Sequence, residues 1–199
     1  DVNDFLDEFH VVIVGKPGIP VISDVKDLKN NYQYLVENDS VPKIYSDNNY
    51  LDYYVERNDF IIKKLLKEKW VSNTKLVLAG HSEGSTIAAK LATKNKKVTH
   101  LIYSGGNPYG RILSMIEEEV FKLKNYDIID YWREVVINKN NLNYNGGDTY
   151  KATYDFSIPS ADNLKKLKIP VLVAFGTKDW NAPFVNLFQI ESIKLNSTN

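Results

Sequence analysis

One stretch, residues 76–92, constrains the fold of this chain more than any other. An apolar run at 76–79 leads into Gly-His-Ser-Glu-Gly, and a run of helix-forming residues follows at once. This order predicts a strand, then a sharp turn centred on Ser82, then a helix. We expect positions 80 and 84 to require small residues such as glycine, because the strand and the helix pass very close to each other at such a turn.

The predicted turn gives Ser82 a chemical environment that a serine in an ordinary loop lacks. Its side chain would project above the edge of the sheet, and the backbone N–H of Glu83 would point towards a developing oxyanion. The positive end of the following helix would add to the same potential. Gly-x-Ser-x-Gly also arises by chance, so the motif is a hypothesis that the rest of the chain has to support.

The composition narrows the classes of partner that this chain is expected to bind. Its 199 residues are enough for one core, and 25 basic residues balance 25 acidic ones. We therefore expect no nucleic-acid partner, and no apolar stretch is long enough to span a membrane. The absence of cysteine excludes disulfides and cysteine-ligated metals. We expect a small-molecule substrate and neither a metal nor a cofactor, whereas the oligomeric state and the compartment stay open.

Further apolar runs predict the architecture around the serine. The runs at 10–15, 98–104 and 169–176 have the composition of strands that are buried on both faces of a parallel sheet. Helical patterns separate them, which predicts an α/β fold with an open, mostly parallel sheet and helices on both faces. Residues 109–168 are too many for a simple crossover, so we interpret them as a helical lid inserted in a single domain, residues 1–199.

With these elements in place, the chain resembles the α/β-hydrolase family. The turn around Ser82 is similar to the nucleophile elbow of that family. The strand at 169–176 and the following Asp179 are similar to the strand and loop that present the acid of the catalytic triad. Residues 9–18 resemble the strand and glycine loop ahead of the elbow. The resemblance implies a serine hydrolase acting on an ester, thioester or peptide, with Ser82 as nucleophile, Asp179 as acid and Glu83 N–H in the oxyanion hole. Taken alone, Asp179 would also suit a simple turn.

The histidine that such a triad requires is not evident in the sequence. His10 and His100 begin predicted strands, at the edge of the sheet opposite the serine, and His81 is adjacent to Ser82 but should point elsewhere. The family histidine follows one further strand after the acid, and the second oxyanion N–H precedes the strand at 10–15. We therefore expect a piece of a longer or processed hydrolase that is inactive by itself. The alternative is a non-catalytic, hydrolase-like module that binds a ligand in the same cleft.

Several residues are candidates for contacts with the substrate. His81 and Trp180 are next to the predicted nucleophile and acid, and Asn107 follows the strand after the elbow. Each has a plainer interpretation, since His81 would also suit packing and Trp180 would suit the core. Aromatic residues of the predicted lid would line an apolar acyl pocket or form the lid's own core: Tyr131, Trp132, Tyr144, Tyr150 and Tyr154.

Overall fold

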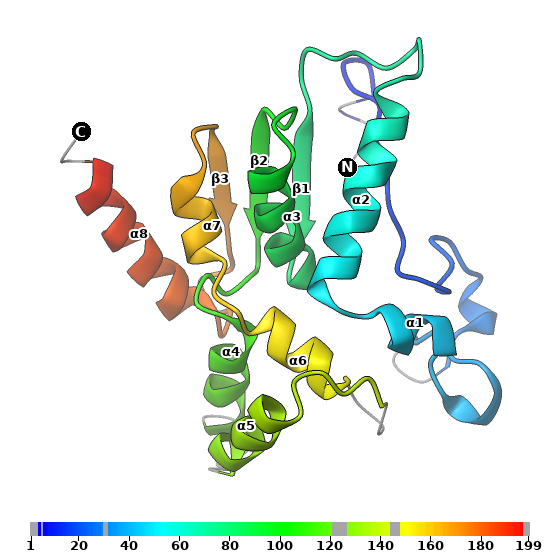
Figure 1. The fold of residues 1–199 in the computed structure, drawn as a ribbon, viewed down its shortest axis with the longest axis vertical. Helices are drawn as coiled ribbons and strands as arrows, with labels where there is room; N and C mark the ends of the chain where they lie inside the picture. The colour runs from blue at the N-terminus through cyan, green and yellow to red at the C-terminus, as the bar shows by residue number, and fades with distance from the viewer. Residues whose placement is uncertain (1–3, 5, 30–31, 121–126, 144–147, 197–199) are drawn as a thin grey trace.

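The protein has an α/β architecture built on a parallel sheet. The computed structural model describes residues 4, 6–29, 32–120, 127–143 and 148–196. Within them, three strands pair in the order β1-β2-β3: β1 (Val77–His81), β2 (His100–Ser104) and β3 (Val171–Ala174). The register places Tyr103 between Gly80 and Val173, so the three strands end together at one edge of the sheet (Figure 1).

Helices account for most of the remaining described residues. Among the described residues ahead of β1 are the 3-10 helices η2 (Val25–Asp27) and η4 (Glu37–Asp39) and the α-helices α1 (Lys43–Asn48) and α2 (Leu51–Leu65). The helix α3 (Glu83–Lys94) connects β1 to β2. Between β2 and β3, the described residues include α4 (Arg111–Glu118), α5 (Ile128–Ile137), α6 (Tyr150–Phe156) and α7 (Ala161–Lys166). Finally, α8 (Ala182–Asn196) follows β3.

The main core lies between the sheet and α3. Helix α3 presents small side chains, Ala88, Ala89 and Ala92, to Leu101 and Tyr103 of β2. Because alanine extends so little from the backbone, the helix lies close to the sheet, and the same core continues to α7 and α8. The strand that carries Ser82 and the helix that follows it are therefore both anchored in the best-packed part of the molecule.

A second core joins α2 to the outer side of α3. Tyr54 and Val55 of α2 pack with Leu91 of α3 and with Phe156 of α6. Ion pairs between the two helices, such as Lys90 Nζ with a carboxylate oxygen of Asp52 at 2.5 Å, lie at the surface of this contact. Helix α3 is thus enclosed between the sheet and α2.

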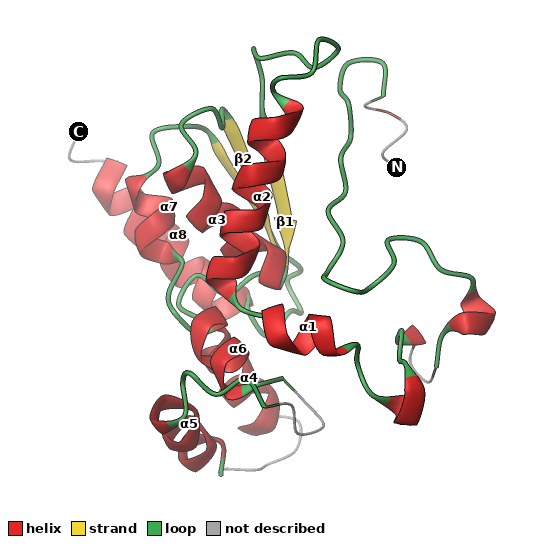
Figure 2. Ribbon diagram, turned by 45° about the vertical axis from the view of Figure 1, so that its right-hand side comes forward, coloured by secondary structure: helices red, strands yellow, loops and turns green. Residues whose placement is uncertain are grey.

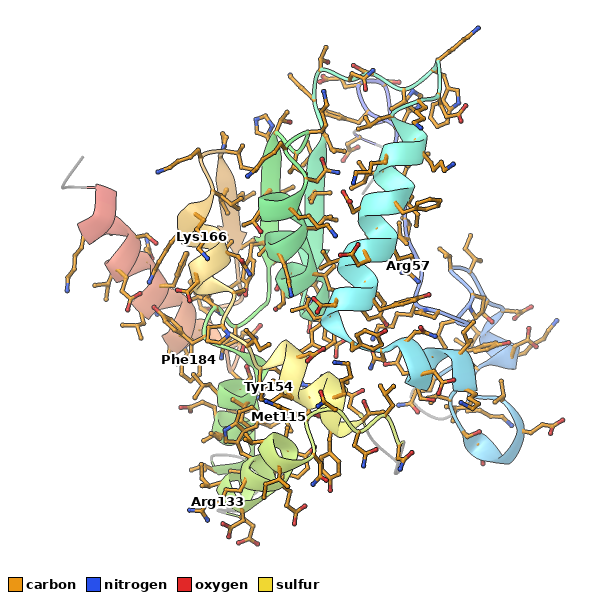
Figure 3. The ribbon with its side chains drawn as sticks, in the orientation of Figure 1. Arg57, Met115, Arg133, Tyr154, Lys166 and Phe184 are labelled. Atoms are coloured by element: carbon orange, nitrogen blue, oxygen red, sulfur yellow. The ribbon has the colours of Figure 1, made fainter. Side chains whose placement is uncertain are left out.

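The segment 109–168 divides between two places in the fold. Helices α4, α5 and α6 contact one another beyond the carboxyl edge of the sheet (Figure 1). Figure 3 shows Met115 of α4 and Tyr154 of α6 in this group. Helix α7 returns to the sheet, where Ala161 and Leu164 join the main core. The interpretation of 109–168 as a lid stays a prediction, and the group that adjoins Ser82 is α4–α6.

The prediction of helices on both faces of the sheet is wrong for the described residues. Side chains of one face are buried, whereas on the other face Val77 is 37% and Leu172 60% exposed. Figure 2 shows α2, α3 and α7 on one side of the strands and only the N-terminal segment on the other. Right-handed crossovers that run in one direction along a sheet place all their helices on the same face, which is the reason.

The predicted strand at 10–15 is also wrong. This segment is extended but belongs to no strand, and Val12 and Ile13 are 51% and 67% exposed. The backbone carbonyl of Gly15 instead accepts a hydrogen bond of 2.8 Å from the guanidinium of Arg57, which extends from α2 towards this segment (Figure 3). An apolar composition favours a strand, but a strand forms only when a neighbouring strand pairs with its backbone.

Candidate functional site

Ser82 occupies an unusual backbone conformation between β1 and α3. Its φ and ψ angles are 54° and −121°, and a positive φ costs a non-glycine residue about 1–2 kcal/mol. The surrounding structure fixes this conformation, since the Ser82 N–H donates to the Ser104 carbonyl at 2.9 Å and the Ser82 carbonyl accepts from the Ser85 N–H at 3.0 Å. Local strain that is held in place in this way is typical of functional sites.

The two glycines of the Ser82 turn (residues 80–84) have different roles. A Cβ atom at Gly80 would lie 2.0 Å from the carbonyl oxygen of Gly84, so the strand and helix do pass too close for any side chain there. A Cβ atom at Gly84 would meet nothing within 4 Å. The expectation that Gly84 must be small is therefore wrong. The close approach involves the backbone of Gly84 and not its missing side chain.

A buried hydroxyl cluster (Ser85, Tyr103 and Ser160) supports the turn from below. The Ser85 hydroxyl donates to the Ser82 carbonyl at 2.5 Å, and the hydroxyls of Tyr103 and Ser160 are 2.9 Å apart. A Cβ atom at Gly106 would lie 1.9 Å from the Ser85 hydroxyl oxygen, so this cluster also requires a glycine. Burial raises the pKa of Tyr103, against the opposing effect of hydrogen bonds from Ser160 and Ser85.

A small cavity opens beside Ser82, and we call it the Ser82 cavity. Its volume is about 100 Å³. The side chains and backbone that surround it come from the Ser82 turn, α3, the end of β2, α4, α6 and the loop after β3: Ser82, Glu83, Thr86, Gly105, Gly106, Asn107, Arg111, Ser114, Phe156 and Asn181. A larger cavity of about 260 Å³ lies at the other end of the strands, near Phe9 and Val77, far along the sheet from the serine.

Hydrogen bonds connect three polar residues in the wall of the Ser82 cavity. The Asn107 amide donates to the Ser114 hydroxyl at 3.0 Å, and Ser114 donates in turn to the side-chain oxygen of Asn181. The Asn181 amide donates to the carbonyl of Gly105 at 3.0 Å. This chain of hydrogen bonds joins α4 to the ends of β2 and β3. The polar side chains of this wall therefore already have hydrogen-bond partners within the protein.

Charged residues form the opposite side of the site. The Glu83 carboxylate lies between Lys16 Nζ at 2.9 Å and the Arg111 guanidinium at 2.7 Å, and Arg111 also pairs with Asp148 at 2.6 Å. Burial opposes the charge on Arg111, but Asp148 and Glu83 outweigh it and raise its pKa, and Glu83 and Tyr45 raise the pKa of Lys16 in the same way. This ion-pair chain (Lys16, Glu83, Arg111, Asp148) joins four segments that are distant in sequence.

Asp179 lies in the loop after β3, at the same edge of the sheet as Ser82. Its backbone N–H donates to the Gly176 carbonyl at 3.0 Å, and its carboxylate accepts from the Asn181 N–H at 2.9 Å. No hydrogen bond joins Asp179 and Ser82 in the described structure. The loop reaches the serine through Asn181, which lines the Ser82 cavity two residues after the predicted acid.

The other predicted contact residues lie in different places. Asn107 is 6% exposed and lines the Ser82 cavity. His81 projects from the bare face of the sheet, where its Nδ1 atom is 3.1 Å from the Ser104 hydroxyl. Trp180 is 42% exposed and does not line the Ser82 cavity. The remaining histidines are also away from the cavity, since His10 contacts the carbonyl of Trp70 and His100 the hydroxyl of Thr99.

The aromatic residues of segment 109–168 pack on one another. Trp132 stacks on Tyr154 with ring centroids 6.0 Å apart, and Tyr131 and Tyr150 are 6.4 Å apart. None of these four lines the Ser82 cavity. Tyr144 lies outside the described residues.

Sequence reasoning missed several residues of the site. Arg111, Ser114 and Phe156 come from α4 and α6, and no motif marks them. Asn181 was within reach of the argument because it follows Asp179 in the same loop. Lys16 and Asp148 pair with the site from segments whose position depends on the whole fold.

Comparisons with known proteins add no identity to this site. No family model and no curated protein matches the chain. Among the residues that the structure describes, no helix is both long and apolar enough to cross a membrane.

Proposed function

We propose that this chain carries the nucleophile side of a serine hydrolase of the α/β-hydrolase type. Ser82 attacks the carbonyl carbon of an ester, thioester or amide and forms an acyl-enzyme, and the N–H of Glu83 stabilises the oxyanion. Asp179 orients a histidine that lies outside this sequence. That histidine accepts the serine proton and returns it to the leaving group.

The observation that carries the proposal is the backbone of Ser82. A serine held at φ 54° and ψ −121° between a parallel strand and a helix, over a glycine that tolerates no side chain, fits a nucleophile turn. Ser85 N–H in the first turn of α3 donates to the Ser82 carbonyl, whereas the N–H of Glu83, at the first position of the helix, has no acceptor in the helical pattern and can donate to an oxyanion beside the serine. The cavity at the same position gives an acyl group a place to bind.

A second candidate is a module that binds a ligand without catalysis. It is favoured by one observation, that none of the three histidines lines the Ser82 cavity. Without a general base, a serine hydroxyl is a poor nucleophile. The two candidates differ in what happens when a base is supplied.

The experiment supplies imidazole in solution to the chain and follows the covalent labelling of Ser82 by a fluorophosphonate with intact-protein mass spectrometry. A positioned base contributes about 10²–10⁴-fold, and we expect imidazole to recover about tenfold of this in the labelling rate. Ser82→Ala should abolish the label. Asp179→Asn should lower the part of the rate that depends on imidazole.

Three results would count against a hydrolase. A labelling rate that does not depend on imidazole, or a label that persists in Ser82→Ala, would mean that the reagent reacts with a different nucleophile. An unlabelled Ser82 at every imidazole concentration would favour the binding module.

A further inference from the structure

We propose that the Ser82 cavity accepts a short, polar acyl group of about three or four non-hydrogen atoms, such as acetyl or glycolyl, and excludes long alkyl chains. This inference rests on the proposed function, because it assigns the acyl part of the substrate to that site. It identifies the class of substrate, which the sequence leaves open between lipid esters, thioesters and peptides.

The volume of the cavity sets the limit on size. Its volume is about 100 Å³, and a cavity of about 150 Å³ binds benzene, which has six non-hydrogen atoms. In proportion, the space holds about three or four such atoms, whereas pockets for larger ligands measure about 300–1,000 Å³. An acetyl or glycolyl group fits this space, and a chain of eight carbons does not.

The walls set the limit on polarity. Asn107, Ser114 and Asn181 form one side, and Arg111 with Glu83 forms another. A hydrocarbon placed against them would remove water from these groups and return no hydrogen bond. An amide nitrogen has two N–H groups and a hydroxyl oxygen has two lone pairs, so Asn107, Asn181 and Ser114 can bond a hydroxyl or amide of the acyl group in addition to their present partners.

Two features keep the cavity from widening. The hydrogen bonds from Asn107 through Ser114 to Asn181 and Gly105 fix the α4 side to the ends of two strands. The aromatic residues that would make a wider apolar pocket are engaged elsewhere, with Trp132 stacked on Tyr154. A wider pocket would require these hydrogen bonds to break and the stacked aromatic rings to separate.

The test replaces Ser82 by cysteine, so that no histidine is needed. The chain has no cysteine of its own, so Ser82→Cys introduces a single thiol. Its thiolate attacks the methylene carbon of iodoacetamide, a C–S bond forms and iodide leaves, and the group added has four non-hydrogen atoms. N-octyl iodoacetamide reacts at the same carbon but carries a long chain. Ser72→Cys, at an exposed position, is the matched control.

The ratio of the two alkylation rates, short over long, is the measurement. We expect this ratio in Ser82→Cys to exceed the ratio in Ser72→Cys by about tenfold or more, which is the lower end of what one misfitting methylene costs in an enzyme pocket. We also expect iodoacetamide to gain several-fold over 1-iodopropane, relative to the same control. Equal ratios in the two variants would overturn the limit on size, and an advantage for 1-iodopropane would overturn the limit on polarity.

A variant that fills the cavity provides an independent check. Ser114→Thr keeps the hydroxyl that bonds Asn107 and Asn181 and adds a methyl group; combined with Ser82→Cys it should slow iodoacetamide by about tenfold, and combined with Ser72→Cys it should react as before. An unchanged rate in the first pair would mean that the reagent does not enter this cavity. Alkylation of a thiol needs neither a base nor Asp179, so these outcomes do not depend on the imidazole experiment. If the imidazole experiment failed, the proposed hydrolase function would be rejected, but the alkylation rates would still have measured the size of the cavity.

Discussion

The two sides of the Ser82 turn are stabilised by different means. Below the turn, the hydroxyl cluster of Ser85, Tyr103 and Ser160 is almost fully buried and carries no charge. Above it, the ion-pair chain has side chains that are between 22% and 47% exposed. The buried side fixes a strained backbone, whereas the charged side joins separate segments where water still reaches them. The contribution of the hydroxyl cluster to stability should therefore depend on packing, whereas the contribution of the ion-pair chain should depend on salt concentration.

The largest effect should come from the contact between strand and helix. Gly80→Ala places a Cβ atom 2.0 Å from the Gly84 carbonyl oxygen, which is backbone and cannot move aside. We expect the free energy of unfolding to fall by about 3 kcal/mol or more, measured by urea denaturation. Gly84→Ala is the control because its Cβ has open space, and we expect a change within about 1 kcal/mol, in the stabilising direction of helix propensity. Equal losses in the two variants would contradict the packing described for the turn.

The next effect should come from the hydroxyl cluster. Ser85→Ala removes the donor to the Ser82 carbonyl and leaves a buried hydroxyl of Tyr103 with one partner fewer. We expect a loss of about 1–3 kcal/mol in the free energy of unfolding. Because no charge is involved, the loss should be the same at low and high salt. A loss that shrinks as salt is added would argue against a neutral support.

The pH dependence of stability provides a test of the same cluster. Burial raises the pKa of Tyr103 above its ordinary value of about 10. Above pH 10 the unfolded chain loses this proton before the folded chain does, so stability falls as pH rises towards the folded pKa. Between the unfolded and the folded pKa of Tyr103, Tyr103→Phe should reduce the loss of unfolding free energy by about 1.4 kcal/mol per pH unit. Urea denaturation at alkaline pH measures it, and an unchanged slope would mean that Tyr103 ionises equally in both states.

The smallest effect should come from the charged side. A double-mutant cycle of Glu83→Gln with Arg111→Gln should give a coupling energy of about 1 kcal/mol in the free energy of unfolding, larger at low salt. The surface pair Asp52–Lys90, in which Asp52 is 67% exposed, is the control and should give about 0.5 kcal/mol or less. A coupling energy between Glu83 and Arg111 that is no larger than in the control pair would mean that the ion-pair chain does not connect α4 to the Ser82 turn.

Much of the fold was predictable because its elements carry local signals. The strand and helix around Ser82 follow from an apolar run, glycines and helix-forming residues that are adjacent in sequence. The strand at 169–176 was predictable for the same reason, and it is present as β3. The segment 10–15 has an equally strong apolar pattern and forms no strand, because pairing depends on a neighbour that sequence patterning cannot supply.

The site divides along the same line. Ser82 and Asp179 could be named from their positions at strand ends, since residues after parallel strands gather at one edge. Arg111, Ser114 and Phe156 could not, because α4 and α6 reach that edge only through contacts with the rest of the fold. Local order in the sequence identifies the turn, but not what surrounds it.

The sequence by itself determined the parallel α/β pattern, the position of the serine and the need for glycine at 80. These depend on periodicity and on backbone sterics, which act between near neighbours. Only the tertiary structure decided that one face of the sheet is bare, that Gly84 has open space, and that the cavity beside Ser82 is small and lined mainly by polar residues. The physical reason is that burial, clearance and cavity size depend on side chains from distant segments, which meet only when the chain is folded.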